Sequence, residues 1–189
     1  MRVVAGELGG RRLVAPRGWR VRPTSDRVRE AIFSALGEIA GARVLDLYCG
    51  TGALGIEAIS RGATAATLVD RDIRAALGNV RNLGLHDRVD LVRADALHWL
   101  VPRATRQGEP PAPFELIFLD PPYRLADRLA PQLDQHLPKH LAPGGRVIVE
   151  SSARRPLQLS LPLLRERRYG GTVVTIHARP GDEEPEAQR

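Results

Sequence analysis

An apolar segment in the middle of the chain ends in an aspartate, two prolines and a tyrosine: FELIF (114–118) continues as LDPPYR (119–124). Consecutive prolines remove two backbone N–H donors and fix two φ angles, while both carbonyl groups stay available as acceptors. This corner offers a carboxylate at Asp120, a rigidly held carbonyl at Pro121 and an aromatic ring at Tyr123. Such groups can hold an amine by its two N–H bonds and stack on a planar base.

A glycine-rich loop lies earlier in the chain, where LDLYCGTGALGIEA (45–58) contains the pattern G-x-G-x-x-G. The pattern follows an expected strand and opens an expected helix, as a nucleotide-binding loop does. Gly50 and Gly52 would let the backbone approach a ligand, and Gly55 would allow tight packing of the helix on the strand. By itself the pattern also suits a nicotinamide dehydrogenase.

Three aspartates mark successive expected strands. Asp46 lies within the first, Asp70 ends the second, and Asp95, followed by Ala96, comes after the third. Asp70 is placed to accept both hydroxyls of a ribose, and Asp95 to accept an adenine amine. A carboxylate at Asp46 would repel a pyrophosphate but would suit an ammonium group. S-adenosyl-L-methionine has an ammonium group, a ribose and an adenine but no phosphate, so the carboxylates favour this cofactor over a dinucleotide.

The two sets of residues together predict methyl transfer to an amine. The end of the fourth strand is expected close to the first strand in the usual order of such sheets. An exocyclic amine of a nucleobase is a poor nucleophile, because its lone pair is delocalised into the ring. Acceptors at Asp120 and Pro121 would orient the amine and Tyr123 would stack on the base, so the displacement needs mainly positioning. Asp120 or water would take the proton.

The elements that position these residues alternate along the chain. Apolar segments rich in valine, leucine and isoleucine predict strands at 43–48, 66–70, 88–93, 114–120 and 145–150. Helical spacing predicts helices at 53–60, 72–83, 96–103 and 125–137. The segments 157–164 and 171–178 are expected to form an antiparallel pair at one edge. This order is typical of an α/β fold with a mostly parallel sheet, which binds ligands at the carboxyl ends of its strands.

The N-terminal region is basic. Residues 1–30 contain three acidic residues and eight arginines, at 2, 11, 12, 17, 20, 22, 27 and 29. This excess indicates a surface that binds a polyanion. The sequence predicts a β-hairpin from Arg2 to Pro16, then a helix that is capped by Thr24 or Ser25 and stopped by Gly41.

Composition argues against several other classes of protein. No apolar segment approaches the roughly 20 residues that span a membrane, and the first residues lack the apolar core of a signal peptide. The single cysteine, Cys49, argues against an internal disulfide and a cysteine-rich metal site. We therefore expect a cytoplasmic protein, monomeric by default and without a metal ion, in which the acidic residues 179–189 form a disordered tail.

Four segments carry a resemblance to a known family. DPPY is similar to the (D/N)-P-P-(Y/F/W) motif of methyltransferases that modify exocyclic amines of adenine, guanine or cytosine. VVAGELGGRRL, RPTSDRVREAIFSAL, VLDLYCGTGALGIEAISRGA and FLDPPY, in this order and spacing, resemble the RsmD family across residues 2–178. That family comprises bacterial enzymes that methylate N2 of one guanine in 16S rRNA.

The resemblance implies a Rossmann-like fold of S-adenosylmethionine-dependent methyltransferases, extended by an N-terminal β-hairpin. It implies S-adenosyl-L-methionine as methyl donor and 16S rRNA in the assembled small ribosomal subunit as substrate. The domains expected are an RNA-binding region (1–24), a methyltransferase domain (25–178) and the tail (179–189). The roles carried over are cofactor binding by Gly50, Gly52, Asp70 and Asp95, catalysis at Asp120–Tyr123, and RNA contacts by Arg11, Arg12, Arg27 and Arg29.

Other functions fit the sequence less well. Cys49 suggests cytosine-C5 methylation, but it lies inside the glycine loop and no Pro-Cys pair follows the fourth strand. Methylation of adenine N6 in DNA or RNA would use the same corner, although the chain leaves little room for a separate target-recognition domain. A catalytically silent RNA-binding module would tolerate loss of DPPY, which is intact. A dehydrogenase would need a hydride-site acid, and no histidine lies at a suitable strand end.

Overall fold

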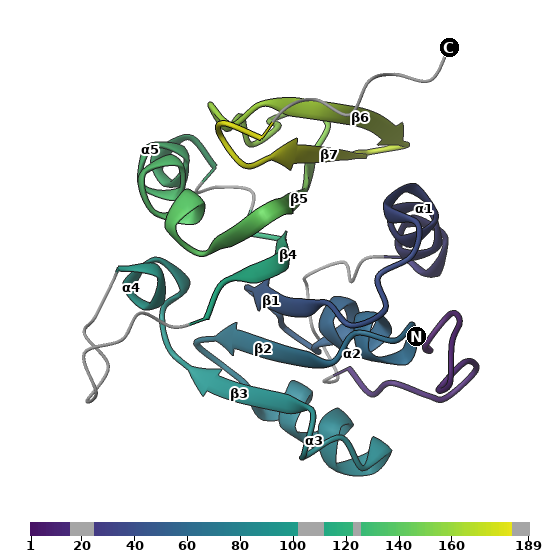
Figure 1. Cartoon of the computed structure of the whole chain (residues 1–189). Helices are drawn as coiled ribbons and strands as arrows, with labels where there is room; N and C mark the ends of the chain where they lie inside the picture. Colours follow the sequence, from purple (N-terminus) through teal and green to yellow (C-terminus); the bar gives the residue numbers. More distant parts are fainter. Residues whose placement is uncertain (16–24, 102–111, 123–125, 183–189) are drawn as a thin grey trace. The chain divides into compact units, whose positions relative to one another are not determined.

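The computed structural model describes residues 1–15, 25–101, 112–122 and 126–182 of the chain. The chain divides into two compact units, Met1–Ala96 and Leu97–Arg189 (Figure 1). The predicted boundaries at residues 24 and 178 do not coincide with this division, and they stay a prediction about function. Tyr123, Thr24 and most of the acidic tail lie outside the described residues.

The first unit is built on three parallel strands in the order β3-β2-β1. Their bounds are Arg43–Leu47 for β1, Ala65–Asp70 for β2 and Val89–Arg93 for β3. Leu47 pairs with Val69 and Asp70 pairs with Arg93, so the loops after all three strands emerge at one edge of the sheet. The predicted carboxylates and glycines of this unit therefore share the carboxyl-terminal edge, as expected.

The helices of the first unit are α1 (Asp26–Leu36), α2 (Ala53–Ser60) and α3 (Arg74–Leu83), and α4 (Ala96–Leu100) begins at its last residue. The predicted bounds of α2 are confirmed. Ser25 caps α1 by accepting a hydrogen bond from the Val28 N–H. The predicted stop at Gly41 is wrong: α1 ends before Gly37, whose φ of 73° is easy only for glycine.

The N-terminal segment doubles back as predicted, although its only ladder in the described part is an isolated antiparallel bridge between Arg2 and Arg12. Its backbone is held by the side chains of α2. The Glu57 carboxylate accepts from the Val4 and Ala5 N–H groups at 2.7 and 3.0 Å, and Ser60 Oγ accepts from the Leu8 N–H at 3.0 Å. A buried glutamate of α2 therefore anchors the backbone of the basic N-terminal region.

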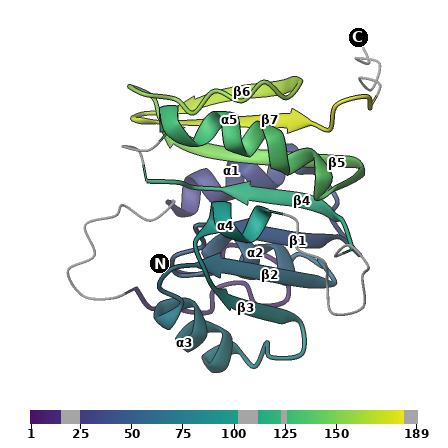
Figure 2. The same ribbon diagram turned by 90° about the vertical axis from the view of Figure 1, so that its left-hand side faces the viewer.

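The second unit contains four strands in the order β4-β5-β7-β6 (Figure 2). Their bounds are Phe114–Leu119 for β4, Leu141–Ser152 for β5, Leu163–Tyr169 for β6 and Thr172–Ala178 for β7. β4 and β5 are parallel, whereas β7 is antiparallel to both β5 and β6. Helix α5 (Ala126–His136) and the short 3-10 helix η2 (Leu137–Lys139) connect β4 to β5. The predicted antiparallel edge is confirmed.

The position of the edge strand differs from the prediction. We expected a strand at 157–164, but β6 comprises LLRERRY at Leu163–Tyr169 and most of its residues are exposed. Leu157 and Leu161 are buried, but they lie in an irregular segment that precedes β6. The apolar pattern marked the buried residues correctly, but an edge strand needs no buried face when charged side chains protect it.

Candidate active site

The loop after β1 is shaped by two glycines. Gly50 and Gly52 have φ angles of 54° and 75°, which residues other than glycine rarely adopt. The Gly50 N–H donates to Asp70 Oδ2 at 2.9 Å, which ties the loop to the end of β2. Gly52 is also the N-cap of α2, so the loop leads directly into the helix N-terminus.

Close packing between α2 and β2 requires the third glycine of the pattern. A Cβ atom on Gly55 would lie 2.2 Å from Leu68 Cδ2, and one on Gly52 would lie 2.8 Å from Leu68 Cδ1. Both distances are well below a van der Waals contact. The predicted role of Gly55 in helix–strand packing agrees with this geometry.

Asp46 is almost fully buried, and its Oδ2 accepts a hydrogen bond of 2.9 Å from the Gly55 N–H. Gly55 lies in the first turn of α2, whose N-cap glycine has no side chain to provide such an acceptor. Burial raises the pKa of Asp46 to about 7, with a smaller contribution from the nearby Asp70. Asp46 therefore caps α2, and a bound ammonium group would favour its ionised form.

Asp70 is fixed by two backbone groups. Its Oδ2 accepts from the Gly50 N–H and its Oδ1 from the Asp72 N–H, each at 2.9 Å. A carboxylate oxygen has room for more than one hydrogen bond, so both oxygens can still accept from a ligand hydroxyl. The oriented carboxylate beside a glycine turn fits a ribose with two free hydroxyls.

Asp95 lies at the same edge and is paired with Arg71. The guanidinium donates to Asp95 Oδ2 from Nε at 3.0 Å and from Nη2 at 2.5 Å. The Asp95 side chain keeps 33% of its surface exposed, and Ala96 after it is buried. An amine that bonds to Asp95 would share this carboxylate with Arg71.

The Asp-Pro-Pro corner belongs to the second unit. Asp120 directly follows β4 and is half-buried, Pro121 is buried and Pro122 is exposed. Because β4 and β5 are parallel, with Leu119 opposite Val149, Asp120 emerges at the carboxyl-terminal edge of this sheet. The structure thus gives the corner the strand-end position that the sequence predicts.

Comparisons with known proteins bear on the whole chain. A family model described as conserved hypothetical protein 95 matches residues 1–178. The Ribosomal RNA small subunit methyltransferase D of Escherichia coli K12 is 31% identical over 195 residues, which cover 99% of this chain and 94% of that protein. The chain belongs to the RsmD family. The resemblance read from the four motifs is confirmed.

Two further relatives of this family support the fold. The Bacillus subtilis protein YlbH is 36% identical over 190 residues, or 96% of this chain and 100% of its own length. The solved structure of a hypothetical protein from Thermus thermophilus is 30% identical, with a TM-score of 0.77 over 94% of this chain and 99% of that one. The predicted Rossmann-like methyltransferase fold, mostly parallel with an antiparallel edge, is confirmed.

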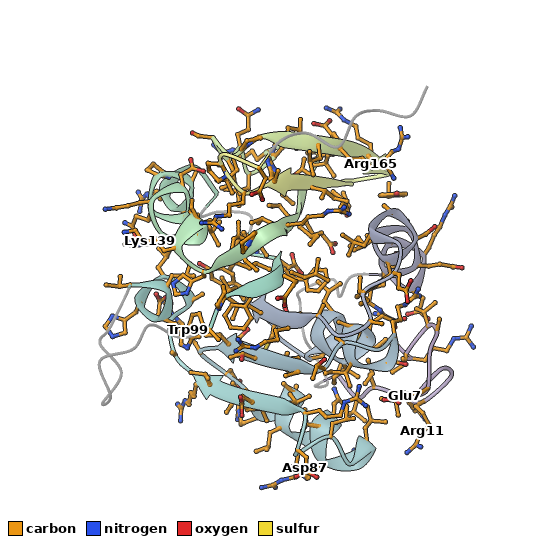
Figure 3. All side chains as sticks on the ribbon, viewed as in Figure 1. Glu7, Arg11, Asp87, Trp99, Lys139 and Arg165 are labelled. Atoms are coloured by element: carbon orange, nitrogen blue, oxygen red, sulfur yellow. The ribbon has the colours of Figure 1, made fainter. Side chains whose placement is uncertain are left out.

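The four arginines assigned to RNA in this RsmD-family chain fall into two groups. Arg11 and Arg12 in the N-terminal segment and Arg27 on α1 are exposed, and Figure 3 shows Arg11 in the N-terminal loop. Arg29 is fully buried, so its predicted contact with RNA is wrong. Its guanidinium pairs with Asp26 at 2.8 Å, lies 3.9 Å from the Glu57 carboxylate and donates to the Arg2 carbonyl.

Tyr48 is a residue that the sequence did not single out. Its φ of 61° makes it the one non-glycine residue with a positive φ among the described residues. Burial, with the nearby Asp95 carboxylate, raises the pKa of Tyr48 to about 12. Strained backbone of this kind is frequent at binding sites, and Tyr48 immediately precedes the glycine loop. Its position before the loop was visible in the sequence, but its backbone angle was not.

Cys49 lies in the same loop and is buried. Burial raises the pKa of its thiol well above the usual range, and Asp46 and Asp70 add to this effect. The thiolate that would attack a cytosine ring is therefore disfavoured. Among the described residues, no group of three or more histidines, cysteines and acids is placed to hold a metal, and no helix is long and apolar enough to cross a membrane.

Proposed function

We propose that this protein methylates the exocyclic N2 of a guanine in 16S rRNA, with S-adenosyl-L-methionine as methyl donor and the assembled small ribosomal subunit as substrate. Membership in the RsmD family supports the reaction and the RNA class. The observation that carries the proposal is the carboxylate edge of the first unit, where Asp70 is oriented by Gly50 beside a glycine turn. We propose a monomeric, cytoplasmic enzyme.

The residues of the first unit fit this donor. The Asp70 carboxylate would accept from the ribose hydroxyls, Asp95 with Ala96 would bind the adenine, and Asp46 would balance the ammonium group. Gly50 and Gly52 remove the side chains that would keep the donor away from the backbone. When bound, S-adenosyl-L-methionine supplies a methyl group on a positively charged sulfur.

The residues of the second unit would prepare the acceptor. The Asp120 carboxylate and the Pro121 carbonyl would accept hydrogen bonds from the two N–H groups of the guanine amine, and Tyr123 would stack on the base. Pro121 and Pro122 restrict the backbone, so the acceptors keep their direction. Transfer would join the amine nitrogen to the methyl group that the donor supplies, the sulfur would keep the electrons of the broken carbon–sulfur bond, and Asp120 or water would take the amine proton. Positioning supplies most of the rate.

The test uses S-adenosyl-L-methionine labelled in its methyl group and small subunits from cells that lack the enzyme. After incubation, the rRNA is digested and its nucleosides are separated. We expect label in N2-methylguanosine at one position. Label in N6-methyladenosine would favour the alternative methyltransferase, and RNA binding without any label would favour a silent binding module.

Substrate form is tested in the same assay. Free 16S rRNA, assembled subunits and double-stranded DNA are offered in parallel at equal concentrations. We expect the fastest labelling with assembled subunits. Equal or faster labelling of free rRNA would contradict the assembled particle as substrate while keeping the reaction.

A further inference from the structure

A second basic surface lies in the second unit, far along the chain from the basic N-terminus. Between Ala153 and Tyr169 the chain has one acidic residue, Glu166, and five arginines. The arginines are all exposed, and we call them the edge cluster: Arg154, Arg155, Arg165, Arg167 and Arg168. Arg165 is labelled on β6 in Figure 3. The net charge of this short segment makes it a candidate surface for a polyanion.

Strand pairing brings the two parts of the edge cluster to one end of the sheet. Ser152 at the end of β5 pairs with Thr172 at the start of β7, and Thr172 pairs with Tyr169 at the end of β6. The Ala153 N–H also donates to the Gly171 carbonyl at 2.9 Å. The turn that carries Arg154 and Arg155 therefore lies beside the β6–β7 turn.

The same end of the sheet carries the Asp-Pro-Pro corner. Leu119 pairs with Val149, so Asp120 is level with Glu150, the next residue of β5. Glu150 pairs with Val174, and Val174 pairs with Arg167. Neighbouring strands lie about 4.8 Å apart, so the three steps from β4 to β6 place Arg167 on the order of 14 Å from Asp120. A strand of RNA a few nucleotides long spans such a distance.

Alternation along β6 separates its side chains into two faces. Arg165, Arg167 and Tyr169 share one face, and Glu166 and Arg168 share the other, where they form an ion pair of 3.4 Å. Among the described residues, neither Arg165 nor Arg167 has a carboxylate partner within ion-pair distance. The face thus offers two uncompensated guanidinium groups and an aromatic ring at regular spacing.

We propose that the edge cluster binds the phosphate backbone of the RNA that flanks the target base. The proposal rests on the proposed function, since it takes Asp120 as the place of the target amine. Guanidinium groups suit phosphate oxygens because they donate in a bidentate geometry, and Tyr169 can stack on an unpaired base. The backbone contacts at β6 and the amine contact at Asp120 lie in one row across the strands.

Protection of the open sheet edge is the competing explanation for these arginines. Charged side chains on an edge strand prevent pairing with another molecule. The two explanations differ in what is lost with the charges: protection predicts aggregation with unchanged RNA binding, and the proposed contact predicts weaker RNA binding by a monodisperse protein.

The experiment compares the double variant Arg165→Ala/Arg167→Ala with the control Arg81→Ala/Arg128→Ala. The control removes the same charge from exposed arginines on α3 and α5. Binding of a fragment of 16S rRNA is measured by fluorescence anisotropy over a range of salt concentrations. We expect the slope of log K against log salt to fall by about 1.5 in the edge variant, since each phosphate contact contributes roughly 0.7 to 0.9.

Two further measurements decide between the explanations. The variant Arg165→Lys/Arg167→Lys keeps the charge, and we expect it to retain most of the slope. Size-exclusion chromatography reports aggregation, and calorimetry with S-adenosyl-L-methionine reports whether the first unit is intact. An edge variant that aggregates with unchanged RNA affinity, or that loses no more affinity than the control, overturns the proposal.

The methylation assay separates this proposal from the proposed function. With active wild-type protein, we expect the edge variant to raise the KM for the RNA several-fold with little change in kcat. If the wild-type protein does not methylate but the edge variant still weakens RNA binding, the proposed function fails and the RNA-binding surface stands.

Discussion

The basic N-terminal region and the edge cluster use arginine in different ways. In the N-terminal region, Arg29 is buried, donates a hydrogen bond to the Arg2 carbonyl and lies beside the Glu57 carboxylate. Its positive charge is therefore paired inside the fold and is not available at the surface. In the edge cluster all five arginines are exposed. The charge excess was larger in the N-terminal sequence, yet burial and pairing decide how much of it is available to RNA. The number of arginines in a segment therefore does not give the number that a partner can reach.

The rate of methyl transfer at Asp120 should be separable from RNA binding by the two basic regions. A substitution of Asp120 has the largest expected effect. We expect Asp120→Ala to lower kcat by at least about a hundredfold, the lower range for a general acid or base. Affinity for S-adenosyl-L-methionine and for RNA should change little, because Asp120 belongs to neither the cofactor loop nor the edge cluster. Single-turnover methylation, calorimetry and anisotropy measure the three quantities. Full turnover by this variant would remove Asp120 from the mechanism.

Arg29 tests the structural side of the comparison. We expect Arg29→Ala to lower the free energy of unfolding by about 3 kcal/mol, because it breaks a buried ion pair and leaves the Glu57 carboxylate without one of its cations. Urea denaturation measures the change. The control is Arg27→Ala two residues earlier, whose exposed side chain should shift stability by less than about 0.5 kcal/mol. Equal effects of the two substitutions would contradict the assigned positions.

Asp46 predicts how the first unit responds to pH. Its pKa is raised from 3.8 to about 7 in the folded protein, so the folded state retains a proton that the unfolded chain releases. Stability from this group is fully present below pH 3.8 and is lost as pH rises through about 7. Between pH 5 and pH 7 we expect a loss of about 2 kcal/mol from this group. Denaturation of the wild type and of Asp46→Asn at both pH values measures the difference, and parallel pH profiles would contradict the assignment.

The exposed N-terminal arginines carry the smallest effect. We expect Arg11→Ala/Arg12→Ala to weaken RNA binding and lower the salt slope by about 1.5, without a change in stability or in cofactor affinity. The anisotropy assay used for the edge variant measures both. If only one of the two double variants weakens binding, the comparison identifies which basic region contacts RNA. If the effects add, both surfaces bind the substrate at once.

Local patterns predicted the elements better than their limits. The strand–loop–helix pattern predicted the observed bounds of α2, because a glycine loop and an apolar helix each depend on residues that are neighbours in the sequence. The pattern failed for β6, because the strand predicted at 157–164 stops before the residues RERRY that form most of β6. β6 is a strand because Leu163–Tyr169 pair with the neighbouring strand β7. The composition of β6 alone does not reveal this pairing.

Site residues show the same division. The positions of Gly50, Asp70 and Asp95 at the carboxyl-terminal edge could be predicted, because each lies at or just after the end of a strand whose apolar pattern is clear. The backbone angle of Tyr48 and the capping bond from Asp46 to Gly55 could not, because they depend on how α2 sits on the sheet. The sequence suggested that Asp46 faces a ligand, and the structure adds that its carboxylate caps α2, the helix that follows the loop.

The sequence by itself determined the alternation of strands and helices, the glycine loop, the acidic strand ends, the Asp-Pro-Pro corner and the family. These features depend on residue types at short spacing, so they are readable without coordinates. Only the tertiary structure decided that Arg29 is an internal cation and that Arg167 lies level with Asp120 across the strands. Only the structure showed that Arg165 and Arg167 have no carboxylate partner among the described residues. Burial and pairing are set by residues distant in sequence, and they determine which charges remain for a partner.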